Sequence, residues 1–175
     1  MTRAAVFGAG SWGTALANLL AKKGHTVRMW SYEADVATSI NELHENTKYM
    51  KGFELAPTLS ASTSLEEVVT GADAVLSISP AQHVRGVMAD AAPFMTDNTL
   101  VISASKGIET RTLCTMAEVL EEVLPNRGTD ACFLSGPSFA LEVAQQQPTA
   151  VTIASLSAHA AERAQELFQT GYFRV

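Results

Sequence analysis

The sequence predicts an α/β fold in which a mostly parallel sheet carries helices on both faces. Short apolar runs alternate with longer stretches of helical periodicity along the chain, and this alternation is typical of parallel strands joined by helical crossovers. The first apolar run leads directly into a glycine-rich turn and then into a helix-forming segment. The chain has 175 residues, of which 47% are hydrophobic and 17% are charged. These values suit one compact domain with a substantial core.

The expected strands are short apolar runs bounded by glycine, proline or polar residues. They cover residues 4–8, 26–30, 73–79, 99–105, 131–135 and 149–155. The last residues of the sequence, 172–175, have the character of a further strand that is beginning.

The expected helices have apolar residues at helical spacing and end at glycine, proline or a polar loop. They cover residues 14–24, 33–45, 64–71, 81–92, 113–124, 138–146 and 158–169. Gly24 suits the left-handed conformation that closes a helix, and Ser64 with Glu67 has the spacing of a capping box. The segment that follows the second helix, through Leu59, is expected to be irregular.

The charge balance limits the class of ligand. A net charge of −6 argues against a general nucleic-acid binder, because such a protein needs clustered lysine and arginine to replace counterions. It does not exclude a small anionic ligand, since a few basic residues in one cleft can outweigh the global sign.

The thiols and the N-terminus indicate a cytoplasmic protein. Cys114 and Cys132 occur without a CxxC pattern, and we expect two free thiols in a reducing compartment. No signal peptide is recognisable, and the first apolar run breaks at Gly8, too early for a membrane span. We expect no stable membrane anchor.

The histidines predict neither a metal site nor a hydrolytic triad. None has the spacing to another histidine, a cysteine or a carboxylate that metal binding needs. They are His25, His44, His83 and His159. His83 is nearest a strand end, but it falls early in an expected helix.

Gly8, Gly10 and Gly13 form a G-x-G-x-x-G motif between the first strand and the first helix. In this context the motif predicts a Rossmann-like, doubly wound fold that binds a dinucleotide. Gly8 permits the tight turn, Gly10 lets the backbone approach a pyrophosphate, and Gly13 lets helix and strand pack closely. Free amides at the start of the helix then receive the phosphate oxygens.

The residues at the end of the second strand suit both NAD(H) and NADP(H). Dinucleotide-binding folds commonly place an acidic residue there, to hold the ribose 2′-hydroxyl. Ser31 occupies that position, Tyr32 follows, and Glu33 comes one step late. A serine does not repel a 2′-phosphate, but no arginine is present to attract one. Tyr32 lies against the adenine or is simply an exposed aromatic residue.

Ligands in such folds bind beyond the carboxyl ends of the strands. Lys106 follows a strongly apolar strand, where its charge can pair with a phosphate or carboxylate, or polarise a carbonyl. Gly136 leaves amides accessible after the next strand. Ser138 is expected to cap the following helix, and in the company of Lys106 a ligand contact is the preferred interpretation. The segment lacks the G-x-S-x-G spacing of a nucleophile elbow.

With these segments in view, the chain closely resembles NAD(P)-dependent glycerol-3-phosphate dehydrogenase of the soluble bacterial type. The matching stretches run in the family's order across nearly the whole chain. They are GAGSWGTALA (8–17), MWSYE (29–33), SPAQHVR (79–85), SKGIE (105–109) and SGPSFALEV (135–143).

The resemblance implies hydride transfer between NAD(P)H and dihydroxyacetone phosphate, giving sn-glycerol 3-phosphate for phospholipid synthesis. It implies cofactor contacts from Ser11, Trp12, Tyr32 and Ala140, with Glu33 as a further candidate. It implies that Lys106 is shared between cofactor and substrate. Gly136 and Ser138 are implied to contact the substrate.

The family's proton-transferring lysine, and the arginine and asparagine that hold the substrate phosphate, belong to a helical second domain. We therefore expect residues 1–175 to be the dinucleotide-binding domain of a longer enzyme or a truncated copy of it, with no catalytic residue and little turnover of its own. These residues are consistent with either a monomer or a homodimer of the full-length protein. The alternatives are a non-catalytic NAD(P)-binding module and the cofactor domain of another reductase, of the 6-phosphogluconate or ketopantoate type.

Overall fold

A computed structural model describes residues 1–125 and 130–175, and within them the expected mostly parallel sheet is confirmed. The main sheet has seven strands in the order β3-β2-β1-β4-β5-β6-β8, and only β6 and β8 run antiparallel. Its strands are β1 (Arg3–Phe7), β2 (Thr26–Trp30), β3 (Leu59–Ser62), β4 (Ala74–Ser77), β5 (Leu100–Ser103), β6 (Cys132–Ser135) and β8 (Thr152–Ala154). A short parallel pair, β7 (Thr149–Ala150) and β9 (Phe173–Arg174), lies apart from it.

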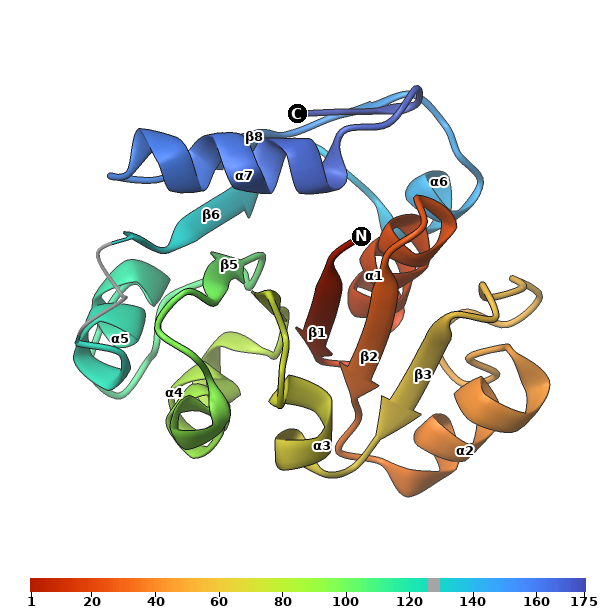
Figure 1. The fold of residues 1–175 in the computed structure, drawn as a ribbon, viewed down its shortest axis with the longest axis horizontal. Coiled ribbons are helices and arrows are strands. Elements are labelled where there is room, and N and C mark those ends of the chain that lie inside the picture. The colour runs from red at the N-terminus through yellow and green to blue at the C-terminus, as the bar shows by residue number, and fades with distance from the viewer. Residues whose placement is uncertain (126–129) are drawn as a thin grey trace.

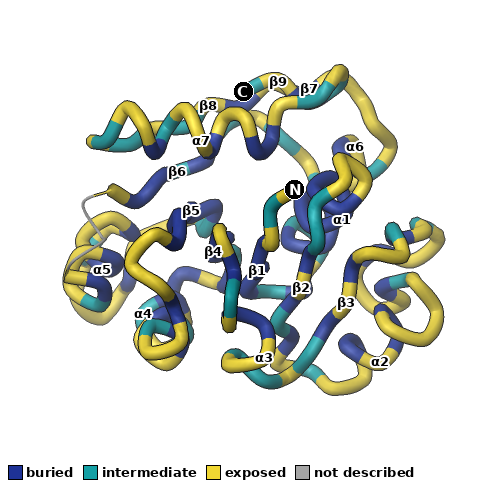
Figure 2. The backbone as a smooth tube through the Cα atoms, in the orientation of Figure 1, coloured by how far each residue is buried: buried dark blue, intermediate teal, exposed yellow. Residues whose placement is uncertain are grey.

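Helices cover both faces of the sheet (Figure 1). One face packs against α1 (Ser11–Lys22), α2 (Ala34–Leu43), α6 (Ala140–Ala144) and α7 (Ala158–Phe168). The other packs against α3 (Leu65–Val69), α4 (Ala81–Ala91), the short 3₁₀ helix η1 (Ala92–Phe94) and α5 (Met116–Val123). The central strands β1, β4 and β5 are buried almost throughout (Figure 2). This arrangement is the doubly wound fold that the sequence predicts.

Helix α1 ends as its sequence indicates. Gly24 has φ of 98°, its N–H donates to the carbonyl of Ala21, and the N–H of His25 donates to that of Leu20. These two bonds form a Schellman motif, which satisfies carbonyls that the helix leaves free.

Strand β3 was not expected, because its sequence LSAS is short and largely polar. It forms the edge of the sheet beside β2. The carboxamide of Asn41, on α2, pairs with its outward side: Nδ2 donates to the carbonyl of Ala61, and Oδ1 accepts from the N–H of Ala61, both at 2.8 Å. The side chain thus replaces a neighbouring strand at this position.

Several boundaries differ from the expected ones. The first helix begins at Ser11, three positions earlier than expected, and α5 begins at Met116 behind a capping box of Thr115 and Glu118. The expected strand 149–155 divides into β7 and β8, which belong to different sheets. The strand at the last residues is confirmed as β9.

The predicted capping box at Ser64 is only half formed. Ser64 Oγ accepts from the N–H of Glu67 at 3.3 Å, as expected. The Glu67 carboxylate, however, accepts from the hydroxyl of Ser62 at 2.5 Å, and the N–H of Ser64 donates to that same hydroxyl. A serine two residues upstream therefore takes the place of the expected reciprocal bond.

His25 gives the fold a dependence on pH. Its Nδ1 accepts from the N–H of Thr2 at 3.2 Å, and its Nε2 is buried without a partner among the described residues. Burial, followed by the charges of Lys23 and the chain N-terminus, lowers the pKa of His25 from its ordinary 6.5. The histidine therefore contributes stability that is full above the unfolded-state pKa and is lost as the pH falls from about 6.5 towards the folded-state pKa.

We expect the free energy of unfolding of the wild-type chain to fall faster than that of His25→Gln as the pH is lowered from about 7.5 to about 5. Urea titrations at a series of pH values measure this difference. Parallel curves for the two proteins would contradict it.

Candidate functional site

The glycine-rich turn between β1 and α1 is built around two close backbone contacts. A Cβ atom on Gly13 would lie 1.9 Å from the carbonyl oxygen of Gly8, and one on Gly8, whose φ is 125°, would lie 3.1 Å from that of Ile78. A Cβ on Gly10 would meet nothing within 4 Å. Packing therefore explains two of the glycines, while the third borders open space.

Helix α1 begins without a side-chain cap. Its N-cap residue is Gly10, and no side chain in the described part of the protein accepts a hydrogen bond from the first turn. The Ser11 hydroxyl points elsewhere and donates to the carbonyl of Tyr49 at 2.8 Å, while Trp12 is half-buried against the core. The main-chain donors and the positive end of the helix dipole are thus offered to a ligand, and this arrangement suits a phosphate group.

At the end of β2, Ser31 is buried and its hydroxyl binds main-chain groups. Its Oγ donates to the carbonyl of Glu33 at 2.9 Å and accepts from the N–H of the same residue at 3.2 Å. Tyr32 is 87% exposed, so its ring is free to contact a ligand.

Glu33 has two side-chain partners that its sequence context does not indicate. Its carboxylate accepts from the Lys48 ammonium at 2.5 Å and from the Tyr49 hydroxyl at 2.7 Å. The hydrogen bond from Lys48, followed by that from Tyr49, lowers the pKa of Glu33. No local sequence signal marks these partners, because they come from an irregular loop after α2.

Lys106 lies just beyond the carboxyl end of β5. The hydroxyl of the preceding residue, Ser105, donates to the carbonyl of Ser79 at 2.7 Å and lies 3.3 Å from that of Ser77, which joins the ends of β5 and β4. Lys106 itself is exposed and makes no hydrogen bond or ion pair with any described residue. The backbone at Lys106 is therefore tied to the neighbouring strand end, while its ammonium group is left free to bind an anion.

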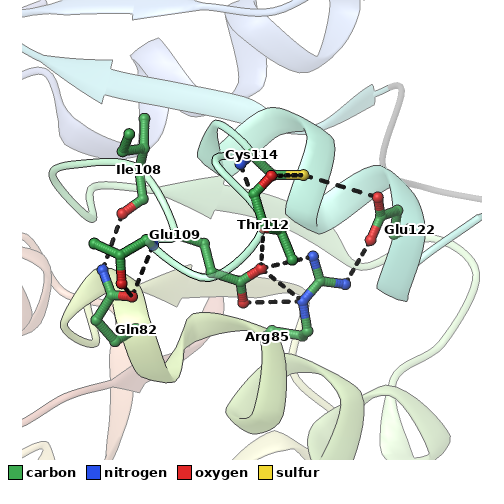
Figure 3. A network of polar contacts seen from close by, with 8 residues as sticks. Gln82, Arg85, Ile108, Glu109, Thr112, Cys114 and Glu122 are labelled. Carbon is green, nitrogen blue, oxygen red and sulfur yellow. Dashed lines mark hydrogen bonds and ion pairs between the residues drawn. The ribbon is translucent and has the colours of Figure 1, made fainter.

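Helix α4 clamps the loop that carries Lys106 (Figure 3). Gln82 donates to the carbonyl of Ile108 at 2.9 Å and accepts from the N–H of Thr110 at 2.9 Å. Arg85 pairs with both oxygens of Glu109 and, at 2.6 Å, with Glu122 on α5.

Glu109 is only 4% exposed, and its hydrogen bond with Arg85 lowers its pKa. Removing Arg85 would leave this buried carboxylate without its cation, whereas removing Glu109 would leave Arg85 paired with Glu122. Two of the sequence segments singled out above, 79–85 and 105–109, are therefore one structural unit.

After β6, the backbone again comes close to a neighbouring segment. A Cβ on Gly136, whose φ is 153°, would lie 2.9 Å from the Cα of Val151, so packing requires glycine here. The prediction that Ser138 caps the next helix is wrong. The N-cap is Phe139, and the Ser138 hydroxyl instead donates to the carbonyl of Gly136 at 3.3 Å.

Ala140 opens helix α6, which packs against α1 (Figure 1). The side chain is partly buried against the core that α1 also lines. The residues singled out from the sequence thus lie on segments that follow β1, β2, β5 and β6. Because these strands are parallel, their carboxyl ends share one edge of the sheet. The His83 side chain is exposed on α4 and makes no polar contact with the described residues.

Within the described part of the chain, no group of three or more histidine, cysteine or acidic side chains could hold a metal ion. Over the same residues, no helix is both long enough and apolar enough to cross a membrane.

The family model for the NAD-dependent glycerol-3-phosphate dehydrogenase N-terminus matches residues 3–161. The chain belongs to this family. It is 47% identical over 172 residues to the glycerol-3-phosphate dehydrogenase [NAD(P)+] of Citrifermentans bemidjiense, covering 98% of this chain and 51% of that protein. Against the enzyme of the same name from Geobacter sulfurreducens, identity is 49%, with 99% and 52% covered.

Solved structures agree with the family. The crystal structure of glycerol-3-phosphate dehydrogenase from Coxiella burnetii matches with a TM-score of 0.92 at 33% identity, covering 99% of this chain and 53% of that one. The glycerol-3-phosphate dehydrogenase of Saccharomyces cerevisiae matches with a TM-score of 0.81 at 26% identity, covering 99% and 55%. The chain thus spans about half the length of these glycerol-3-phosphate dehydrogenases.

The two glycines that differ in packing give a matched test of the turn. Gly13→Ala should lower the free energy of unfolding by about 2 kcal/mol or more, because the new methyl group collides with a backbone carbonyl. Gly10→Ala should cost less than about 1 kcal/mol, since its methyl group enters open space. Chemical denaturation of both variants measures the difference, and equal losses would contradict the geometry.

Proposed function

We propose that this chain is the cofactor-binding half of an NAD(P)-dependent glycerol-3-phosphate dehydrogenase. The whole enzyme transfers hydride between NAD(P)H and dihydroxyacetone phosphate, giving sn-glycerol 3-phosphate for glycerophospholipid synthesis. The observation that carries the proposal is the uncapped start of α1 at Gly10, set at the strand ends of a chain that belongs to this family.

The residues of the glycine-rich turn fit a dinucleotide. The space that a Cβ on Gly10 would fill lies beside an uncapped helix start, and a pyrophosphate needs this combination of room and free amides. Gly8 and Gly13 shape the turn, while Ser11 and Trp12 provide contact surface beside it. Tyr32 and Glu33 serve the adenosine end, and Ala140 borders the cofactor from α6.

Lys106, Gly136 and Ser138 serve the substrate. When bound, the nicotinamide ring of the cofactor supplies or accepts the hydride. Lys106 offers an ammonium group, unpaired among the described residues, for a phosphate or a carbonyl oxygen at the boundary between cofactor and substrate. The main chain around Gly136 and the hydroxyl of Ser138 lie after the neighbouring strand, β6.

The relatives extend to about twice the matched length. We assign the proton transfer and the main substrate-phosphate contacts to a second, helical domain, and expect residues 1–175 to bind cofactor but to turn over little by themselves. The exposed apolar side chains of Phe139 and Leu141, at the start of α6, are compatible with a covering domain. We place the enzyme in the cytoplasm and leave its dimerisation to experiment.

Gly10→Asp should abolish cofactor binding, because a carboxylate would occupy the cradle and repel the pyrophosphate. Titration of the chain with NADH and NADPH, followed by nicotinamide fluorescence, measures this loss. Gly86→Asp is the matched control, since a Cβ there also meets nothing within 4 Å but lies on α4. Unchanged cofactor affinity in the Gly10 variant would show that the glycine-rich turn does not bind the pyrophosphate.

Lys106→Ala in the full-length enzyme should lower kcat/KM by about tenfold or more, because a charged hydrogen bond contributes about 1.5–3 kcal/mol. Steady-state kinetics with dihydroxyacetone phosphate and NADPH provide the measurement. Lys22→Ala, an exposed lysine at the far end of α1, controls for loss of charge. A decrease in kcat/KM of less than about twofold would show that Lys106 is only a solvated surface residue.

A further inference from the structure

We propose that Lys48 receives the 2′-phosphate of NADP(H), and that its ion pair with Glu33 sets the balance between NADP(H) and NAD(H). The inference rests on the proposed function and adds to it a residue that selects between the two cofactors. It starts from the loop after α2, which brings a cation to a strand end where the sequence offers no arginine.

The loop is fixed to the glycine-rich turn through Asn46, whose side chain is fully buried. Its Nδ2 donates to the carbonyl of Ala9 and to the Thr14 hydroxyl, both at 2.8 Å. Its Oδ1 accepts from the N–H of Tyr49 at 3.1 Å, and its carbonyl accepts from the N–H of Met50 at 2.8 Å. Lys48 therefore stands in a tight turn that one buried side chain anchors to the start of α1.

A second attachment comes from the opposite direction. The Ser11 hydroxyl donates to the carbonyl of Tyr49, and the Tyr49 side chain donates to Glu33 at the end of β2. The loop thus bridges the two places that hold the pyrophosphate and the adenosine ribose in a dinucleotide-binding fold. A cation on this bridge lies in the region where a ribose 2′-substituent is held.

The ion pair is accessible and can exchange. The side chains of Lys48 and Glu33 are 46% and 32% exposed, and an exposed pair of this kind is weak. The hydrogen bond with Glu33 raises the pKa of Lys48, so the ammonium is charged at neutral pH. Asp35 and the Tyr49 hydroxyl also act on this ammonium, and Asp35 adds a second negative charge to the group.

NAD(H) and NADP(H) would interact differently with the Lys48–Glu33 ion pair. The ribose 2′-hydroxyl of NAD(H) donates a hydrogen bond to a carboxylate. Glu33 can accept this bond while its ion pair with Lys48 stays intact. The 2′-phosphate of NADP(H) instead competes with Glu33 for the ammonium and is repelled by the carboxylate it displaces. Lys48 therefore favours NADP(H), Glu33 opposes it, and the chain accepts both cofactors.

The test is a set of dissociation constants for NADPH and NADH, measured by fluorescence titration of the chain and its variants. Lys48→Met should weaken NADPH binding by about tenfold or more and change NADH binding by less than about twofold. Glu33→Gln should strengthen NADPH binding and weaken NADH binding. Lys51→Met is the matched control, because Lys51 lies in the same loop, is exposed and has no polar partner among the described residues.

The outcomes separate this inference from the function on which it rests. Equal effects of Lys48→Met on both cofactors, or no effect on either, overturn the role of Lys48 and leave the proposed function standing. A loss of NADPH affinity in Lys51→Met as large as in Lys48→Met also overturns it. Failure of the wild-type chain to bind either cofactor overturns the proposed function, and the inference with it.

Discussion

The contact between Gly13 and the carbonyl of Gly8 is the constraint on which the site depends. With only 1.9 Å between that oxygen and the place of a Cβ atom, helix α1 can approach β1 only if residue 13 has no side chain. This approach sets the uncapped start of the helix directly at the strand ends. The helix dipole then acts at the edge of the sheet, where the loops from the other strands also gather.

Polar side chains hold those loops in place at little cost in buried charge. The Ser79 hydroxyl donates to the carbonyl of Phe7, and that of Ser105 donates to the carbonyl of Ser79, so successive strand ends are tied together. The one nearly buried carboxylate of the clamp, Glu109, is fully engaged by Arg85. Rigid neighbours of this kind let an exposed lysine act without first ordering its own loop.

What the sequence could predict was local or periodic. The glycine-rich turn, the alternation of the other strands with helices and the end of α1 each depend on neighbouring residues, and the structure confirms them. The edge strand β3 was missed because its four residues are too polar to resemble a buried strand. The cap at Ser138 was misplaced because the chain stays extended to Phe139 before the helix begins.

Contacts between distant residues left no such signal. Lys48 reaches Glu33 only because a loop without periodicity folds back over the glycine-rich turn, and Arg85 reaches Glu109 across two elements. Nothing in the local sequence marks either pair, since pairing depends on where the loops are carried by the fold. The family resemblance indicated which sequence segments form the site, whereas the contacts between these segments are seen only in the structure.

The carboxamide of Asn41 has a consequence for how copies of this chain meet in a crowded solution. An open sheet edge presents hydrogen-bonding groups that can recruit a strand from another molecule and begin aggregation. Here the outward N–H and carbonyl of Ala61 are already engaged, and the N–H of Leu59 donates to the carbonyl of Ala56. The Asn41 amide and the turn at Ala56 together occupy outward-facing groups that a strand from another molecule would need for pairing.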